Sequence, residues 1–390
     1  MTARTAIQRD LDRFFKAISC SDYNIREVTK SAFTQARAKL NAWAFVRLSE
    51  VAFDTFYAQA EIYTWYGFRV LAVDGSRLML PNHPTIKAEF GEHSFGPKAD
   101  SVRSMAMISM LYDVLNLVTI DARMDKYAAS ERDLLEQHLE TDLKCADNLL
   151  LLDRGYPSIN LLYLLTAKKI HFCIRMTDHW WLSVKDLLKS GEREKIVSFK
   201  LPKKDRKKLA NYPEIVDIEL KCRLLKIDLP DGKYEILCSS LTDMQTYKYE
   251  EFEGLYHLRW NEEESYKMLK SRVEVENFTG KTARAVRQDF FAKIFLMNLC
   301  AIYSHPIEEK VRAEYIENEQ RKHAQKINRT HALATLRDIL VPMFIRRKAE
   351  QSIKAFDTLV ENTRELIRPE RKVPRKKRPK KLYYMNYKNL

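Results

Sequence analysis

The run Leu149–Leu152 restricts the fold of this chain more than any other segment. Four consecutive leucines follow Asn148, and the run ends at the turn sequence Asp153-Arg154-Gly155. A strand in which every side chain is apolar is typical of a sheet covered on both faces, because a face open to water would need alternating polar residues. The segment therefore predicts an α/β fold with a buried sheet.

The flanking segments supply the other strands and helices of such a sheet. Short apolar and β-branched runs predict strands, and helical spacing with a capping residue such as Ser130 predicts helices. In chain order we expect strands at 68–73, 104–112 and 117–123, a helix at 130–139, the strand at 148–152, a helix at 159–168 and a strand at 171–175. The predicted core is a mixed α/β sheet.

The remaining regions differ from this core in composition. Residues 1–66 are predicted to be helical, and the segment Thr29–Leu40, capped by Thr29 or Ser31, fits either a DNA-binding helix-turn-helix or a plain packing helix. We expect a core at 67–175 and 250–304, which includes a helix near 283–304, and a β-rich insertion at 176–249 with a hairpin around Pro230-Asp231-Gly232. A helical C-terminal region at 305–367, with helical sequence near 328–362, and a basic tail at 368–390 follow.

Charge and motif content narrow the class of protein. The formal net charge is +14 and the pI is about 9.3, which favours a polyanionic partner, nucleic acid above all. The six cysteines form no C-x-x-C pair, and we expect reduced thiols in a cytosolic protein. Because no signal core, membrane-spanning run or phosphate-binding glycine loop is present, we expect neither a membrane nor a nucleotide cofactor as a partner.

The segment Tyr256–Lys270 gathers one carboxylate among cations if it forms one helix. At about 100° per residue, Tyr256, Arg259, Glu263, Lys267 and Lys270 share a stripe about 80° wide, while Glu262 and Glu264 point about 100° to either side. A single acid on a basic face suits a metal ligand next to a polyanion. The alternative is an ordinary solvated face with i,i+4 ion pairs.

Two aspartates are candidates for the other ligands. Asp74 ends the first predicted strand and Asp153 ends the fourth, and the carboxyl ends of strands are where open sheets present functional groups. If these two strands are neighbours, both carboxylates converge and Glu263 completes the set. Three carboxylates of this kind bind two Mg²⁺ or Mn²⁺ ions, which promote in-line displacement at a phosphodiester.

These residues resemble a known family. The pattern Y-x-x-R-x-x-x-E-x-x-x-x-x-x-K, formed by Tyr256, Arg259, Glu263 and Lys270, is similar to the signature of the insertion-sequence-four family of DDE transposases. Val73-Asp74-Gly75-Ser76 and Leu152–Tyr156 resemble the two aspartate motifs of that family, and 31–37 is similar to its N-terminal segment.

The resemblance implies a ribonuclease-H-like core and metal-dependent, cut-and-paste transposition of DNA. It implies that Asp74, Asp153 and Glu263 bind the metal ions. It also implies that Tyr256, Arg259 and Lys270 contact DNA phosphates, and we add Lys267 and Arg154 as candidate DNA-binding residues.

The resemblance also implies partners and a location. The expected partner is double-stranded DNA, both the inverted-repeat ends and the target, bound by a homodimer in the bacterial cytoplasm at the nucleoid. Relatives release the flanking DNA through a hairpin and stack a flipped base on an aromatic ring, for which Trp180 and Trp181 are the candidates. The basic tail either clamps DNA or acts as a solubilising end.

Two other functions are compatible with the same residues. One is an inactive or repurposed transposase that binds a specific DNA sequence. The other is a metal-dependent nuclease that hydrolyses DNA without strand transfer.

Overall fold

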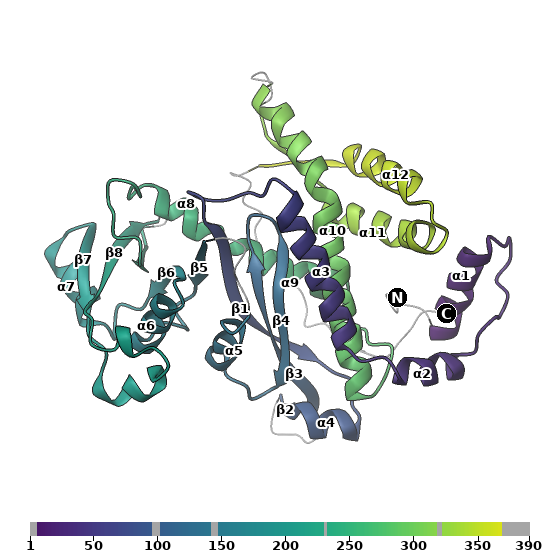
Figure 1. Ribbon diagram of the computed structural model, residues 1–390, viewed down its shortest axis with the longest axis horizontal. Coiled ribbons are helices and arrows are strands. Elements are labelled where there is room, and N and C mark those ends of the chain that lie inside the picture. Colours follow the sequence, from purple (N-terminus) through teal and green to yellow (C-terminus); the bar gives the residue numbers. More distant parts are fainter. Residues whose placement is uncertain (1–5, 96–101, 142–146, 230–231, 318–321, 369–390) are drawn as a thin grey trace. The chain divides into compact units, whose positions relative to one another are not determined.

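The computed structural model describes residues 6–95, 102–141, 147–229, 232–317 and 322–368 (Figure 1). The chain forms two compact units. The first contains residues 1–59, 77–106 and 267–390, and the second contains residues 60–76 and 107–266.

Nine strands form one sheet in the order β2-β3-β1-β5-β6-β9-β8-β7, with β4 paired to β3, and a two-stranded sheet joins β10 and β11. The strands are β1 (Arg69–Met79), β2 (Glu92–Ser94), β3 (Val102–Asp113), β4 (Val118–Lys126), β5 (Asn148–Leu152), β6 (His171–Met176), β7 (Glu194–Phe199), β8 (Leu220–Asp228), β9 (Tyr234–Ser239), β10 (Gln325–Ile327) and β11 (Arg364–Leu366).

Helices precede, connect and follow these strands. They are α1 (Ile7–Ser19), α2 (Lys30–Ala38), α3 (Trp43–Gln59), α4 (Pro84–Phe90), α5 (Glu131–His138), α6 (Ile159–Ala167), α7 (Leu182–Ser190), the 3₁₀ helices η2 (Lys203–Leu209) and η3 (Pro213–Ile215), α8 (Glu251–His257), α9 (Trp260–Ser271), α10 (Ala283–Glu317), α11 (Arg329–Leu340), the π-helical η4 (Val341–Ile345) and α12 (Ala349–Glu361).

The order β4-β3-β1-β5-β6 is that of a ribonuclease-H-like sheet, which confirms the predicted fold class. Hydrogen bonds from Val114 to Val70 and from Leu80 to Ser104 make β1 and β3 antiparallel. β5 is parallel to both β1 and β6. All four leucines of β5 are buried, as the sequence predicts. The sheet therefore has the antiparallel half and the parallel half that this fold requires.

The predicted β-rich insertion adds strands to this same sheet. β9 pairs antiparallel with β6, β8 pairs with β9, and β7 pairs with β8. The fully buried guanidinium of Arg223 on β8 donates to Glu194 on β7 and to the carbonyl of Tyr247, so its charge is compensated where it lies. Of the predicted hairpin turn, Pro230 and Asp231 lie outside the described residues.

In the first unit, α3 lies alongside α10 (Figure 1). Asn298 on α10 donates to the hydroxyl of Ser49 on α3 at 2.7 Å. Among the described helices, α10 alone is long and apolar enough to cross a membrane, and 56% of its apolar window is buried inside the protein. That much burial is typical of a core helix.

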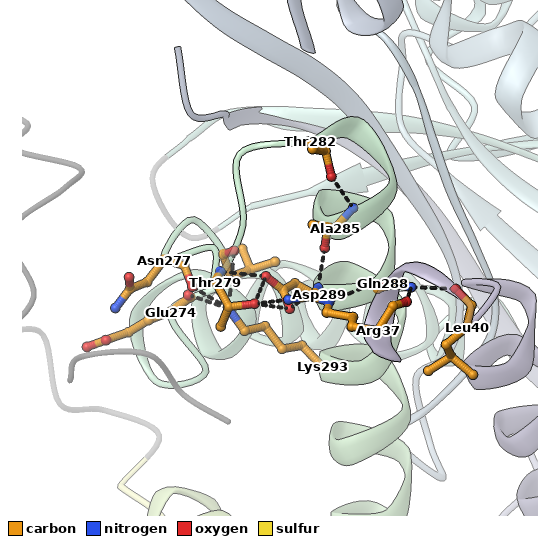
Figure 2. Close-up of polar contacts among 11 residues, drawn as sticks. Arg37, Leu40, Glu274, Asn277, Thr279, Thr282, Ala285, Gln288, Asp289 and Lys293 are labelled. Atoms are coloured by element: carbon orange, nitrogen blue, oxygen red, sulfur yellow. Dashed lines mark hydrogen bonds and ion pairs between the residues drawn. The ribbon is translucent and has the colours of Figure 1, made fainter. Parts of the chain in front are cut away.

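The predicted N-terminal helix α2 begins after Thr29, whose hydroxyl accepts from the amide of Ala32. No residue of α2 is fully buried. Arg37 attaches it to the α10 region, because its guanidinium donates to Asp289 at 2.8 Å and also to the hydroxyl of Thr279 (Figure 2). Gln288 adds hydrogen bonds to the carbonyls of Arg37 and Leu40, so several polar contacts with the α10 region hold α2.

The C-terminal helical prediction needs one correction. Residues 328–362 do not form a single helix, because α11 passes into η4 at Val341 and the chain turns at Arg347, whose φ is 55°, before α12. Pro342 has no amide hydrogen to continue the α-helical bonding, which explains the change. Residues 369–390, most of the predicted basic tail, lie outside the described part of the chain.

Candidate active site

Asp74 lies within a strand and not at its end, contrary to the sequence prediction. β1 continues to Met79, and the strand passes through Gly75-Ser76 without a turn. Pairing between β1 and β5 still aligns the two aspartates, since Ala72 pairs with Leu151 and Asp74 and Asp153 each follow by two residues. The predicted adjacency of the two strands is therefore confirmed, although only Asp153 follows the end of its strand.

The helix expected over Tyr256–Lys270 is interrupted, which is a second correction. α8 ends at His257 and α9 begins at Trp260, and the amides of Leu258 and Arg259 bond to carbonyls three residues back. This tighter winding changes the angular relation between Tyr256 and the glutamates. The single-helix angles therefore do not decide which glutamate faces Asp74.

The main chain of Asp74 is bound on both sides by residues of α9. Its amide donates to Oε1 of Glu262 at 2.7 Å, and its carbonyl accepts from the hydroxyl of Tyr266 at 2.8 Å. Its carboxylate accepts from the amide of Gly75 at 2.8 Å. These bonds fix both peptide groups next to Asp74.

Glu262 and Glu263 have different environments. Glu262 is completely buried, and its Oε2 has no hydrogen-bond partner among the described residues. The side chain of Glu263 is 31% exposed and accepts from Arg259 at 3.1 Å, while the Arg259 side chain is only 7% exposed. Glu263 is therefore the glutamate that solvent and ligands reach, and Glu262 is built into the fold.

The acids at this site raise one another's proton affinity. The pKa of Asp74 is raised to about 6, chiefly by burial and in smaller part by the charges of Glu131 and Glu263, against the opposing effects of the Gly75 amide and Arg259. Burial also raises the pKa of Glu262 well above its usual value. Carboxylates partly removed from water and near one another form a site that favours a cation.

Gly75 lies against the side chain of another acid, Glu131. A Cβ atom at Gly75 would lie 2.7 Å from Cγ of Glu131, the first residue of α5. Glu131 is an acid of this site that the sequence reasoning missed, since it has the appearance of an ordinary first-turn helix acid after the Ser130 cap.

Asp153 has an oxygen without a protein partner. Its Oδ1 is buried and makes no hydrogen bond within the described residues. Next to it, the buried Tyr256 directs its hydroxyl to the carbonyl of Leu152 at 3.4 Å. The guanidinium of Arg259 lies 5.8 Å from the centre of the Tyr256 ring, whereas Arg154 is exposed on the turn after β5.

Lys267 and Lys270 lie on the last turns of α9, in the first unit. Lys267 is exposed. Nζ of Lys270 donates to the carbonyl of Arg77 at 2.8 Å, and burial lowers the pKa of this lysine.

The donor set suits a hard divalent cation, which prefers carboxylate oxygens. The buried Asp153 Oδ1 without a partner and the raised pKa of Asp74 both indicate uncompensated acidic groups. Among the described residues, however, no three His, Cys, Asp or Glu side chains stand close enough together to hold a metal ion. The residues therefore fit a metal by chemistry, and binding requires their side chains to move together.

The two tryptophans of the insertion are distinct. Trp180 is 85% exposed. The ring of Trp181 packs edge-on against Phe199, with 5.5 Å between ring centres. Trp180 is thus the one with a ring face open to a ligand.

Three comparisons with known proteins found matches. A model of the family described as Transposase DDE domain matches residues 65–299. Transposase InsG for insertion sequence element IS4, from Escherichia coli strain K12, is 26% identical over 281 residues, which cover 70% of this chain and 60% of that protein. A piggyBac transposase, solved in a synaptic complex with hairpin DNA, aligns with a TM-score of 0.44 and 13% identity over 75% of this chain and 57% of that one.

Proposed function

Because the chain belongs to the transposase DDE domain family, we propose that it cleaves DNA at the inverted-repeat ends of a transposon and joins those ends to target DNA, by cut-and-paste. The observation that supports this most is the alignment of Asp74 with Asp153 across β1 and β5. The chain spans about 60% of the length of the relative it matches, so the activity of the whole relative is part of the proposal.

We assign Asp74, Asp153 and Glu263 as the ligands of two Mg²⁺ or Mn²⁺ ions. Bound there, the ions would activate the attacking water or 3′-hydroxyl and stabilise the leaving oxygen. Asp74 is held by its main chain, one oxygen of Asp153 has no hydrogen-bond partner among the described residues, and Glu263 is partly exposed whereas Glu262 is buried. Arg259 reduces the repulsion among these acids, because its charge lowers the pKa of Asp74.

Five residues were expected to contact DNA phosphates, and their positions suggest different roles. Arg154 and Lys267 are exposed and suited to phosphates, and Lys270 is half-buried. Tyr256 and Arg259 are buried. We infer that these two residues support the acids and reach DNA only after the site rearranges.

The partners follow from the proposed reaction. They are double-stranded DNA, as transposon ends and target, and a second copy of the chain in a synaptic complex. Trp180 is the residue we assign to base stacking, because its ring is exposed. The proposed location is the bacterial cytoplasm, at the nucleoid, and the basic tail adds nonspecific DNA affinity.

One experiment separates this function from the two alternatives. The purified full chain is incubated with Mg²⁺ and DNA that ends in the inverted repeats bracketing its gene, with a target plasmid present. Cleavage followed by joining supports a transposase. Cleavage without joining indicates a nuclease, and binding without cleavage indicates a repurposed DNA-binding protein; either result contradicts the proposal.

A further inference from the structure

A series of hydrogen-bonded polar side chains outside α9 leads to the main chain of Asp74. His138 on α5 places Nδ1 2.8 Å from Oδ2 of Asp121 and Nε2 3.0 Å from the hydroxyl of Ser109. The Ser109 hydroxyl donates to the backbone carbonyl of Asp74 at 3.1 Å. His138 and Ser109 are both completely buried.

Each of these hydrogen bonds needs one donated proton, which fixes where the protons lie in the series Asp121–His138–Ser109. Ser109 has one hydroxyl proton, which it donates to the Asp74 carbonyl. The contact between Ser109 and His138 then needs a proton on Nε2, and the contact with Asp121 needs one on Nδ1. All three bonds form together when His138 is an imidazolium beside an ionised Asp121.

Asp121 is suited to remain ionised. Burial alone would raise its pKa, but the hydrogen bond and charge of His138, together with Arg123, outweigh burial and lower it. Arg123 donates to Asp121 at 2.6 Å, and the hydroxyl of Thr141 donates at 3.1 Å. The negative charge of Asp121, at the end of the series farthest from Asp74, is therefore compensated by Arg123 and His138.

The residue types are those of a hydrolase triad, but the geometry excludes that role. Ser109 is completely buried on β3, and its proton is already donated to a main-chain carbonyl. No substrate reaches such a hydroxyl.

We propose that the hydrogen-bonded series Asp121–His138–Ser109 is a positioning device that fixes the main chain of Asp74, from which its carboxylate reaches the metal. The inference rests on the proposed function. The carbonyl of Asp74 accepts from both Ser109 and Tyr266, while its amide is held by Glu262. Supporting hydrogen bonds of this kind change metal affinity or activity by about 10- to 100-fold when they are removed.

The test compares two serines of the same strand. Ser109→Ala removes the bond to Asp74. Ser104→Ala is the matched control, because Ser104 is also completely buried on β3 and its hydroxyl has no partner among the described residues. Mn²⁺ affinity without DNA, DNA affinity in chelator, cleavage rate and unfolding midpoint are measured for both.

Ser109→Ala should weaken Mn²⁺ binding and slow cleavage by about 10-fold or more, with DNA affinity unchanged. Ser104→Ala should match the wild type in all four measurements. Equal Mn²⁺ affinity and equal cleavage in the two variants would overturn the proposal. If the wild type does not cleave DNA, the proposed function fails, whereas a Mn²⁺ defect specific to Ser109→Ala still supports the positioning role.

Asp121→Asn tests the outer end of the chain independently. In the hydrogen-bonded series, Asp121 is linked to Asp74 through His138 and Ser109. Removing the Asp121 carboxylate should therefore weaken Mn²⁺ binding in the otherwise wild-type protein and have no additional effect in the Ser109→Ala variant. Additive losses in the double variant would show that Asp121 acts by another route and would contradict the proposal.

Discussion

The amide of Asp74 donates a hydrogen bond to the carboxylate of Glu262 at 2.7 Å. The glutamate next to Glu263 in sequence thus joins α9 directly to β1. Because Tyr266, four residues further on, binds the carbonyl of Asp74, one face of α9 is attached to this strand at two points. The attachment sets where Glu263 lies relative to Asp74.

The first prediction concerns Glu262. The single-helix geometry predicts a mild effect for substitution of Glu262 or Glu264, but the structure revises this for Glu262. Glu262→Ala leaves a buried amide of Asp74 without a partner and should reduce the free energy of unfolding by about 1–3 kcal/mol. Glu262→Gln keeps an acceptor and should be nearly as stable as the wild type. Denaturant unfolding compares the two, and equal losses would show that the hydrogen bond is unimportant.

The second prediction concerns pH. The pKa of Asp74 is about 6 in the folded protein, above its ordinary value of 3.8, so folding favours its protonated form. Its contribution to stability is full below about pH 4 and is lost as the pH rises through 6. In chelator, Asp74→Asn should therefore gain stability relative to the wild type between pH 4 and 7, by about 1–3 kcal/mol. Thermal unfolding of both proteins across this pH range is the measurement. A stability difference that does not change with pH would contradict the prediction.

The third prediction separates the two tryptophans. Trp181→Ala removes packing against Phe199 and should cost about 1–3 kcal/mol of stability, whereas Trp180→Ala should change stability by less than about 0.5 kcal/mol. In reactions with end-containing DNA, the Trp180 variant should accumulate DNA nicked at the transposon end, because the hairpin step that uses the stacked base is slowed. Wild-type processing by the Trp180 variant would remove it from the proposed stacking role.

The fourth prediction concerns the attachment of α2. Arg37→Ala should release α2 from Asp289 and increase hydrogen exchange over Lys30–Ala38, with weaker binding to transposon ends if this helix contacts them. Arg47→Ala is the control, because the polar contact of Arg47 within the described residues is an exposed pair with Glu50. Unchanged exchange in the Arg37 variant would show that other contacts hold α2.

Much of the core could be predicted from sequence, because apolar runs and capping residues are local signals. β5 was located by its leucines and α5 by Ser130, whose hydroxyl accepts from the amide of Arg132. The length of β1 was missed, since Gly75-Ser76 has the composition of a turn while pairing with neighbouring strands keeps it extended. Non-local pairing overrides local preference here.

The site was predicted in part for the same reason. The two aspartates could be aligned from strand order alone. The roles of Glu262, Tyr266 and the Asp121–His138–Ser109 chain depend on contacts between segments far apart in sequence, which no local pattern reveals. The helix break at Leu258 could not be anticipated either, because nothing in that sequence stops a helix.

The most direct test measures Mg²⁺-dependent cleavage of end-containing DNA by Asp74→Asn, Asp153→Asn and Glu263→Gln, with Glu264→Gln as the exposed control. The proposed function predicts that the first three variants bind the DNA but cut it at least about 1,000-fold more slowly, since each loses a metal ligand. Glu264→Gln should cut at close to the wild-type rate. Cleavage by all three at the wild-type rate would contradict the assignment of these acids as the catalytic centre.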